Sequence, residues 1–333
     1  MNSEVVMLVV SLLYGIPSLV LYVAILVQLV RPKYEKRFNN PFFKLCFLLG
    51  VVDCVGYLDF YIFLTLPTYS IFSSFYGSSF FTPSAFTTGI YFMSYFSGYL
   101  QLFGNCFLTF NRFTSIVFPF RHTKIWRKLF PISIVATVIF ALAPCWFLAT
   151  TKTFYMPLYE NSPDSGYALA YDAPKYPNFK NGFNMFLSNF IACGFCLMMN
   201  IVVVTFLVIH GSRIAGVVPR NRKAELNMFF MALIIFILQG IYGLHQVLTY
   251  ISARAGNDTF ITVLYTLLPW ISDLKFLSPA WVLFVVSTSI RETVMNVLPR
   301  WLRPNRTVAG GSVITATSVQ QLNANQSRVF VKR

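Results

Sequence analysis

Long apolar stretches alternate with short polar ones along the whole chain. Seven stretches are long enough to cross a lipid bilayer, because a spanning helix needs about 20 mostly apolar residues. They cover approximately residues 5–30, 42–66, 87–118, 129–151, 183–210, 226–252 and 260–290. The first has no charged residue and is longer than the apolar part of a secretory signal peptide, so we expect it to be retained. The pattern predicts an all-α membrane protein with a bundle of seven transmembrane helices.

Positively charged residues gather on one side of this predicted bundle. Most of the 26 Lys and Arg residues lie in the stretches 31–44, 112–128, 213–223 and 291–333, which all fall on the same side. Cytoplasmic loops carry an excess of Lys and Arg, so we expect the N-terminus outside and the C-terminus in the cytoplasm. The same bias accounts for the net charge of +15 without a nucleic-acid partner.

The composition excludes a soluble protein. Hydrophobic residues make up 56% of the chain and charged residues 11%, whereas ordinary globular chains have about 25% charged residues. A chain this apolar cannot cover a surface that faces water, so membrane lipid is its expected surrounding. The six cysteines lie inside apolar stretches without zinc-binding spacing, and no catalytic or phosphate-binding motif is present. We therefore expect no enzyme activity, metal or cofactor.

The predicted membrane domain covers residues 1–302. It ends with a short amphipathic helix on the membrane surface, residues 291–302, which alternates apolar and basic positions. Residues 303–333 are rich in Ser, Thr, Asn and Gln, which predicts a disordered cytoplasmic tail.

The end of the third apolar stretch carries the most informative motif. Residues 111–119 read Asn-Arg-Phe-Thr-Ser-Ile-Val-Phe-Pro, and this resembles the D-R-Y-x-x-I-x-x-P stretch of rhodopsin-like G-protein-coupled receptors. Arg112 and Pro119 keep their spacing, while Asn111 replaces the acid and Phe113 replaces the tyrosine.

A fuller resemblance covers roughly residues 8–300. The chain is similar to nematode serpentine chemoreceptors of class gamma or the related class V, in its residues 14–18, 42–43, 111–119 and 277–279 and in the following Arg291. The resemblance implies a chemosensory receptor that binds a small molecule and couples to a heterotrimeric G protein. It also implies a location in the plasma membrane, and for such receptors in sensory cilia.

Arg112 is the first candidate for the activation switch, with Asn111, Phe113 and Pro119 as the rest of the coupling motif. The resemblance implies this role. A basic residue at a cytoplasmic helix end is otherwise explained as a membrane anchor. Asn111 cannot supply the charge of the family's acid, so we expect no lock between Arg112 and an acid inside the motif.

Placing an ionisable residue at membrane depth costs about 2.5–3.5 kcal/mol on insertion scales. Each such residue therefore needs an explanation. Asp53, Asp273 and Lys275 lie inside predicted helices, and we group them with Asn105 as a candidate polar network. Asp273 and Lys275 are two positions apart, about 200° around a helix, so they do not simply pair with each other. We hypothesise that Lys275 or Asp273 faces Asp53. Alternatively, each is neutralised by protonation, by snorkelling or by a backbone carbonyl, and Asn105 joins two helices.

Asp59, His245 and Gln246 lie in the outer halves of the second and sixth stretches and are candidates for a ligand pocket between helices. Asp59 is alternatively a solvated acid near the outer surface. His245 is alternatively hydrogen-bonded to a neighbouring helix.

Three other functions compete with a G-protein-coupled receptor. A ligand-gated cation channel subunit of a chemosensory type has the opposite orientation to the one that the charges predict. A transporter is disfavoured by the odd helix number and the missing internal repeat. A receptor with a developmental role is not distinguished by the sequence.

Overall fold

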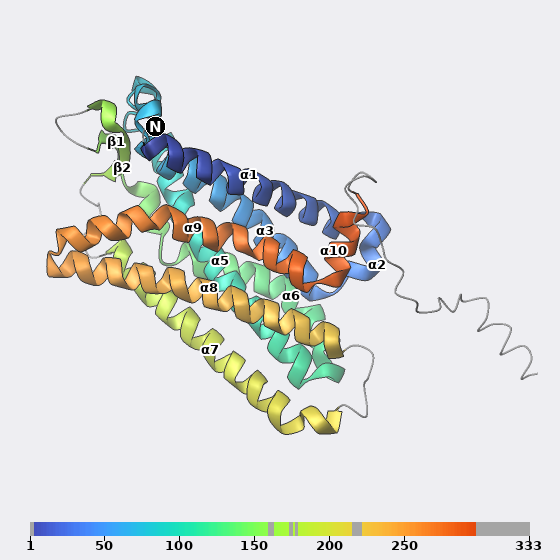
Figure 1. Ribbon diagram of the computed structural model, residues 1–333. Coiled ribbons are helices and arrows are strands. Elements are labelled where there is room, and N and C mark those ends of the chain that lie inside the picture. The colour runs from blue at the N-terminus through green and yellow to red at the C-terminus, as the bar shows by residue number, and fades with distance from the viewer. Residues whose placement is uncertain (1–2, 159–162, 173–175, 177–178, 215–221, 298–333) are drawn as a thin grey trace, which may run out of the picture. The chain divides into compact units, whose positions relative to one another are not determined.

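The computed structural model describes residues 3–158, 163–172, 176, 179–214 and 222–297 (Figure 1). The chain forms two compact units, Met1–Val294 and Met295–Arg333, and the first is described below. The predicted tail of residues 303–333 and the second half of the predicted amphipathic helix lie outside the described residues.

Seven long helices make up the first unit, as the sequence predicted. They are α1 (Ser3–Val30), α3 (Pro41–Phe60), α5 (Ala85–Val117), α6 (Pro119–Leu142), α7 (Asn181–Ile214), α8 (Arg222–Ala255) and α9 (Asp258–Val286). Shorter elements connect or follow them: α2 (Glu35–Phe38), α4 (Ser73–Tyr76), α10 (Thr288–Met295), and the strands β1 (Thr153–Pro157) and β2 (Tyr167–Tyr171). Short 3-10 or π-helical segments join several of these. Among them are the π-helical segment η2 (Tyr61–Thr65) and the 3-10 segment η6 (Trp146–Thr150).

Six of the seven long helices are long and apolar enough to cross a membrane, and α5 is the exception. Although α5 has 33 residues, Ser, Thr, Tyr, Asn and Gln residues are spread along it and interrupt its apolar runs. These polar residues are largely buried, because α5 packs against α3, α6, α7 and α8 together. The helix with polar residues spread along its length is thus the central one.

The bounds of two predicted helices differ from the structure. The fourth helix was expected at 129–151, but α6 begins ten positions earlier, at Pro119, and ends at Leu142. Proline suits the first turn of a helix, where its missing N–H is not needed, so α6 starts directly after Phe118. The last helix was expected to run to residue 290. Instead α9 ends at Val286, the backbone of Ser287 is extended, and α10 follows in a new helix.

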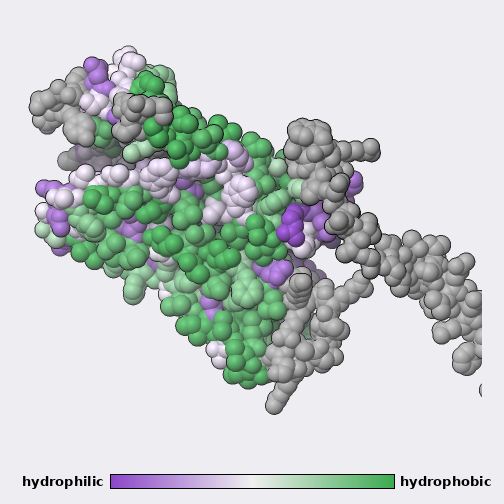
Figure 2. All heavy atoms as spheres, in the orientation of Figure 1, coloured by the Kyte–Doolittle hydropathy of each residue, from purple (hydrophilic) through white to green (hydrophobic). Residues whose placement is uncertain are grey.

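The outer surface of the bundle is apolar along the helices. Large hydrophobic residues are exposed on α1, α6, α7, α8 and α9, and Figure 2 shows hydrophobic side chains over the middle of the visible face with polar ones gathered at its two ends. A soluble protein does not expose so much continuous apolar surface. The surface fits a lipid surrounding and a multi-pass membrane protein.

The two ends of the bundle differ. At one end, here named the hairpin end, β1 and β2 form an antiparallel hairpin with Thr153 opposite Tyr171 (Figure 1). The rings of Tyr76, Phe81 and Tyr155 pack there with centroids 5.0–5.4 Å apart. Burial raises the pKa of Tyr76 to about 12, so its hydroxyl stays protonated. The opposite end, named the Arg112 end, holds α2, α10 and the turn between α5 and α6.

Candidate functional site

Arg112 lies at the last turns of α5, fully enclosed by the bundle. Its side chain is 1% exposed, and its guanidinium carbon lies 3.9 Å from the centre of the Phe42 ring on α3. Nη1 donates to the sulfur of Met228 on α8 at 3.5 Å, and Nη2 donates to the side-chain oxygen of Asn111. A cation on an aromatic face is stabilised by about 2 kcal/mol when water is excluded. Arg112 therefore joins α3, α5 and α8 through an aromatic ring, a thioether sulfur and an amide oxygen.

The rest of the coupling motif shapes the turn between α5 and α6. The amide nitrogen of Asn111 lies 3.3 Å from Nε2 of His122 on α6. Phe113 is half-buried, with its ring 5.8 Å from Phe110, and Pro119 is the exposed first residue of α6. The structure brings Arg112 and Asn111 into contact and assigns Pro119 to starting the next helix.

A second contact holds the same turn. The indole Nε1 of Trp126 donates to the hydroxyl of Thr114 at 2.8 Å, and Trp126 is completely buried. Because Thr114 is on α5 and Trp126 on α6, this bond fixes the angle between the two helices.

Asp53 lies in the interior of the bundle and is 2% exposed. One of its oxygens accepts from the hydroxyl of Tyr22 on α1 at 2.5 Å, and the other accepts from Nε2 of Gln101 on α5 at 2.6 Å. Hydrogen bonds to a carboxylate are about twice as strong as neutral ones. Asp53 thus connects α1, α3 and α5 through two donors.

Lys275 is the cation nearest to this carboxylate in the bundle interior, yet the two do not form an ion pair. Lys275 is 4% exposed, and its Nζ lies 3.9 Å from the centre of the Tyr242 ring on α8. Among the described residues no carboxylate oxygen lies within 4.0 Å of Nζ. The link to Asp53 is indirect, because Gln101 Nε2 also donates to the backbone carbonyl of Lys275 at 3.2 Å.

Asp273 faces a different part of the bundle. Its carboxylate accepts from the hydroxyl of Tyr14 on α1, and the residue is 5% exposed. We had two candidates for a residue that faces Asp53. The backbone of Lys275 is linked to Asp53 by hydrogen bonds through Gln101. Asp273 is instead hydrogen-bonded to Tyr14 of α1.

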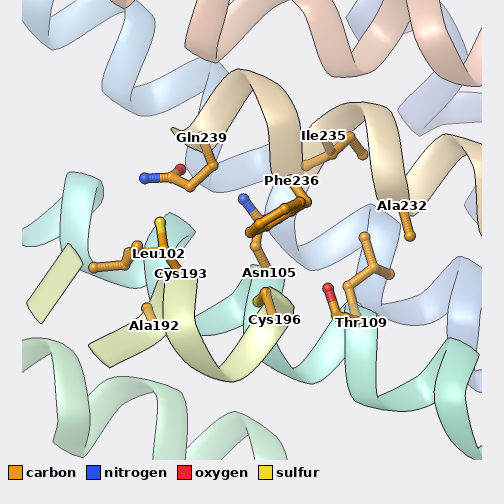
Figure 3. A pocket seen from close by; sticks show the side chains of 11 residues that line it. Leu102, Asn105, Thr109, Ala192, Cys193, Cys196, Ala232, Ile235, Phe236 and Gln239 are labelled. Carbon is orange, nitrogen blue, oxygen red and sulfur yellow. The ribbon is translucent and has the colours of Figure 1, made fainter. Parts of the chain in front are cut away.

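Asn105 lies apart from Asp53, Asp273 and Lys275, the other residues of the predicted polar network. It lines a small cavity between α5, α7 and α8, with Thr109, Cys196 and Gln239 (Figure 3). The cavity volume is about 10 Å³, about the room for one water molecule. The buried side-chain oxygen of Gln239 has no hydrogen-bond partner among the described residues. No hydrogen bond between described side chains joins Asn105 to Asp53.

The three candidate pocket residues are not brought together by direct bonds. Half-buried Asp59 accepts from the hydroxyl of Ser94 on α5. Nε2 of His245 donates to the backbone carbonyl of Leu264 on α9 at 2.9 Å, and His245 is buried. Gln246 is half-buried on the next position of α8. In the described part of the chain no hydrogen bond links any two of the three, and the bond of His245 is the interhelical one considered as the alternative.

Sequence reasoning missed the neutral partners of the charged residues. Tyr22, Gln101, Tyr242, Tyr14 and Met228 all contact an ionisable side chain of the interior. Each lies in an apolar stretch, where a tyrosine, glutamine or methionine carries no periodic signal of its own. The pair Phe42-Phe43 was noted only as part of a resemblance, and its packing on Arg112 was not anticipated.

No metal or cofactor site is indicated by the described side chains. They contain no group of three or more His, Cys, Asp or Glu residues placed to hold a metal ion. In the described contacts, Arg112 joins α8 to α3 and Lys275 joins α9 to α8.

Comparisons with known proteins identify relatives over most of the chain. The family model described as Srg family chemoreceptor matches residues 8–294. The chain is 26% identical to the Caenorhabditis elegans protein "Serpentine receptor class V-1" over 84% of that protein and 83% of this chain. It is 25% identical to "Serpentine receptor class gamma-31" of the same organism, over 92% of that protein and 87% of this chain. A third relative, "Serpentine receptor class gamma-20", is 21% identical over 71% of its length and 78% of this chain.

Proposed function

Because the chain belongs to the Srg family of chemoreceptors, and is thus a seven-helix receptor of the membrane, we propose that it binds a small molecule at its hairpin end and signals to a heterotrimeric G protein at its Arg112 end. The hairpin end faces the outside of the cell and the Arg112 end the cytoplasm. The charge bias supports this orientation, since residues 31–44 and 112–128, both rich in Lys and Arg, meet at the Arg112 end.

The ligand pocket lies among the helix halves at the hairpin end. Half-buried Asp59 and Gln246 are the residues of our candidate set with side chains partly open to a ligand. A ligand changes the equilibrium of a two-state bundle only by binding one state more tightly, so its contacts must differ between the states. Movement of α8 against α5 and α9 is the conformational change that would couple ligand binding at the hairpin end to signalling at the Arg112 end.

The observation that carries the proposal is the position of Arg112. A buried guanidinium at the cytoplasmic helix end, held by Phe42 of α3 and Met228 of α8, is not what a membrane anchor requires. An anchor would place its charge in water or among headgroups.

Nucleotide exchange tests this role. Full-length receptor in lipid nanodiscs is mixed with each class of Gα subunit, and exchange is measured per correctly folded receptor, without added ligand and with candidate odorants. We expect Arg112→Ala to lower exchange about tenfold, the factor for losing one hydrogen-bonded charged group of about 1.4 kcal/mol. Its surface level should be unchanged.

The matched control is Arg127→Ala, because Arg127 is an exposed cation at the same end on α6. Equal losses in both variants would show that only total positive charge matters. Equal exchange per receptor in Arg112→Ala and the unchanged chain would overturn the switch role.

A further inference from the structure

A cleft at the hairpin end lies outside the residues considered so far. It separates the first turns of α5 from the segment 149–152, which contains the end of η6 and the two residues after it. Its volume is about 440 Å³, which falls within the range of small-molecule sites, about 300–1,000 Å³. Its lining includes Ser84, Thr88, Gly89, Phe92, Thr150 and Lys152.

The two walls of the cleft are held together by hydrogen bonds. The hydroxyl of Thr88 on α5 donates to the backbone carbonyl of Thr151 at 2.9 Å, and that of Thr87 donates to the carbonyl of Thr153 at 2.7 Å. Thr87 also forms a capping box with Ser84 at the start of α5. Gly89 lines the cleft, and a Cβ there would meet nothing within 4 Å, so open space adjoins this position.

The charge of the cleft comes from one residue. Lys152 is its only ionisable lining residue and is exposed, and within the described part of the chain no carboxylate oxygen lies within 4.0 Å of its Nζ. The hydroxyls of Thr88 and Thr150 already donate to backbone carbonyls. The ammonium of Lys152 therefore remains as a donor for an occupant with negatively charged oxygen atoms.

An aromatic path leads away from the cleft along α5. The rings of Phe92 and Phe96 are stacked with centroids 5.4 Å apart and an angle of 15°, and both rings are partly exposed. They lie one helical turn apart, and Phe96 is farther from the hairpin end. In a bilayer this places Lys152 at headgroup level and the two rings progressively deeper in the hydrocarbon region.

We propose that this cleft binds an amphiphilic anion, with its carboxylate or phosphate group on Lys152 and its apolar chain along Phe92 and Phe96. The arrangement suits such a molecule, since Lys152 and Phe92 line the same cleft and Phe92 stacks on Phe96. The site is distinct from Asp59, His245 and Gln246 and does not depend on G-protein coupling.

Photolabelling tests the proposal on the full-length receptor in phosphatidylcholine nanodiscs. The probe is a long-chain fatty acid with a diazirine on its chain, and the matched neutral probe is the fatty alcohol with the same chain. We expect the acid to label peptides containing residues 85–96 and 149–152. Lys152→Gln should lower this labelling about threefold, as for one exposed charge pair.

Two further variants define the outcome. Gly89→Leu should fill the cleft and remove labelling there, whereas Lys180→Gln, which neutralises another exposed lysine at the same end, should leave it unchanged. Equal labelling by acid and alcohol, or equal labelling of the unchanged chain and Lys152→Gln, would overturn the anion site. Labelling confined to other peptides would overturn the cleft itself.

Changing the lipid composition of the bilayer distinguishes two sources of the anion. Replacing part of the phosphatidylcholine by phosphatidylglycerol, which is anionic, should compete with the probe if a lipid headgroup occupies the site. A soluble short-chain carboxylate that competes equally in both bilayers would assign the site to a diffusible acid. Competition by neither would contradict the proposal.

Discussion

Two ionisable residues inside the bundle, Asp53 and Lys275, contact neutral side chains. Asp53 has the hydroxyl of Tyr22 and the amide of Gln101, and Lys275 has the ring of Tyr242. A buried ion pair recovers its desolvation cost only with excellent geometry, so hydrogen bonds and aromatic faces are a feasible alternative. The positions of the charges could be predicted from the sequence because charges are rare in these stretches. Their partners could not, since a tyrosine within an apolar helix has no distinguishing pattern.

The contact of Lys275 with Tyr242 should stabilise the pairing of α9 with α8. Tyr242→Leu removes the aromatic face, and we expect the free energy of unfolding to fall by about 1–2 kcal/mol. Tyr242→Phe keeps the face and is the matched control, with a change near zero. Thermal unfolding of the purified receptor in nanodiscs measures both. A similar loss in the two variants would assign the effect to the hydroxyl rather than to the ring.

At the scale of elements, hydropathy located the membrane spans but not the full helices. Residues 121–128 are strongly basic, so they were left outside the fourth helix, although α6 runs through them from Pro119. The helix extends beyond the apolar stretch, and its basic residues there are exposed. The start was visible in the sequence as a proline at the first helical position. The break at Ser287 falls where the apolar run ends, because Thr288 and Ser289 follow it, so the predicted end at residue 290 lay beyond this change.

The hairpin between β1 and β2 depends on one glycine. Gly166 has φ of +109°, and a Cβ there would lie 2.6 Å from the backbone carbonyl oxygen of Thr68. Gly166→Ala is therefore both strained and blocked by backbone, and we expect a loss of about 1–3 kcal/mol with loosening of the hairpin. Gly240→Ala on α8, where a Cβ meets nothing within 4 Å, should cause no loss.

Limited proteolysis of intact cells measures this difference at the hairpin end. Faster cleavage within residues 153–171 is expected for Gly166→Ala and not for Gly240→Ala. Unchanged cleavage of Gly166→Ala would show that the hairpin tolerates a shift away from Thr68.

At the scale of the whole molecule, the seven-helix bundle follows from the hydropathy pattern, and its membership of the Srg family follows from the match over residues 8–294. The polar residues of α5 are the main exception to the pattern, because the central helix of a bundle faces protein on nearly all sides and does not have to be apolar. The orientation of the chain across the membrane is inferred from the distribution of Lys and Arg residues alone. In the proposed function, this orientation assigns ligand binding to the hairpin end and G-protein coupling to the Arg112 end.

The accessibility of the two termini in intact cells tests this direction most directly. Epitope tags are placed on the N-terminus and on the C-terminus of the full chain, and antibody binding is compared before and after permeabilisation. We predict an N-terminal tag that is accessible in intact cells and a C-terminal tag that is accessible only after permeabilisation. An accessible C-terminus with a hidden N-terminus would contradict G-protein coupling at the Arg112 end and would make recording of ligand-gated ion currents the next experiment.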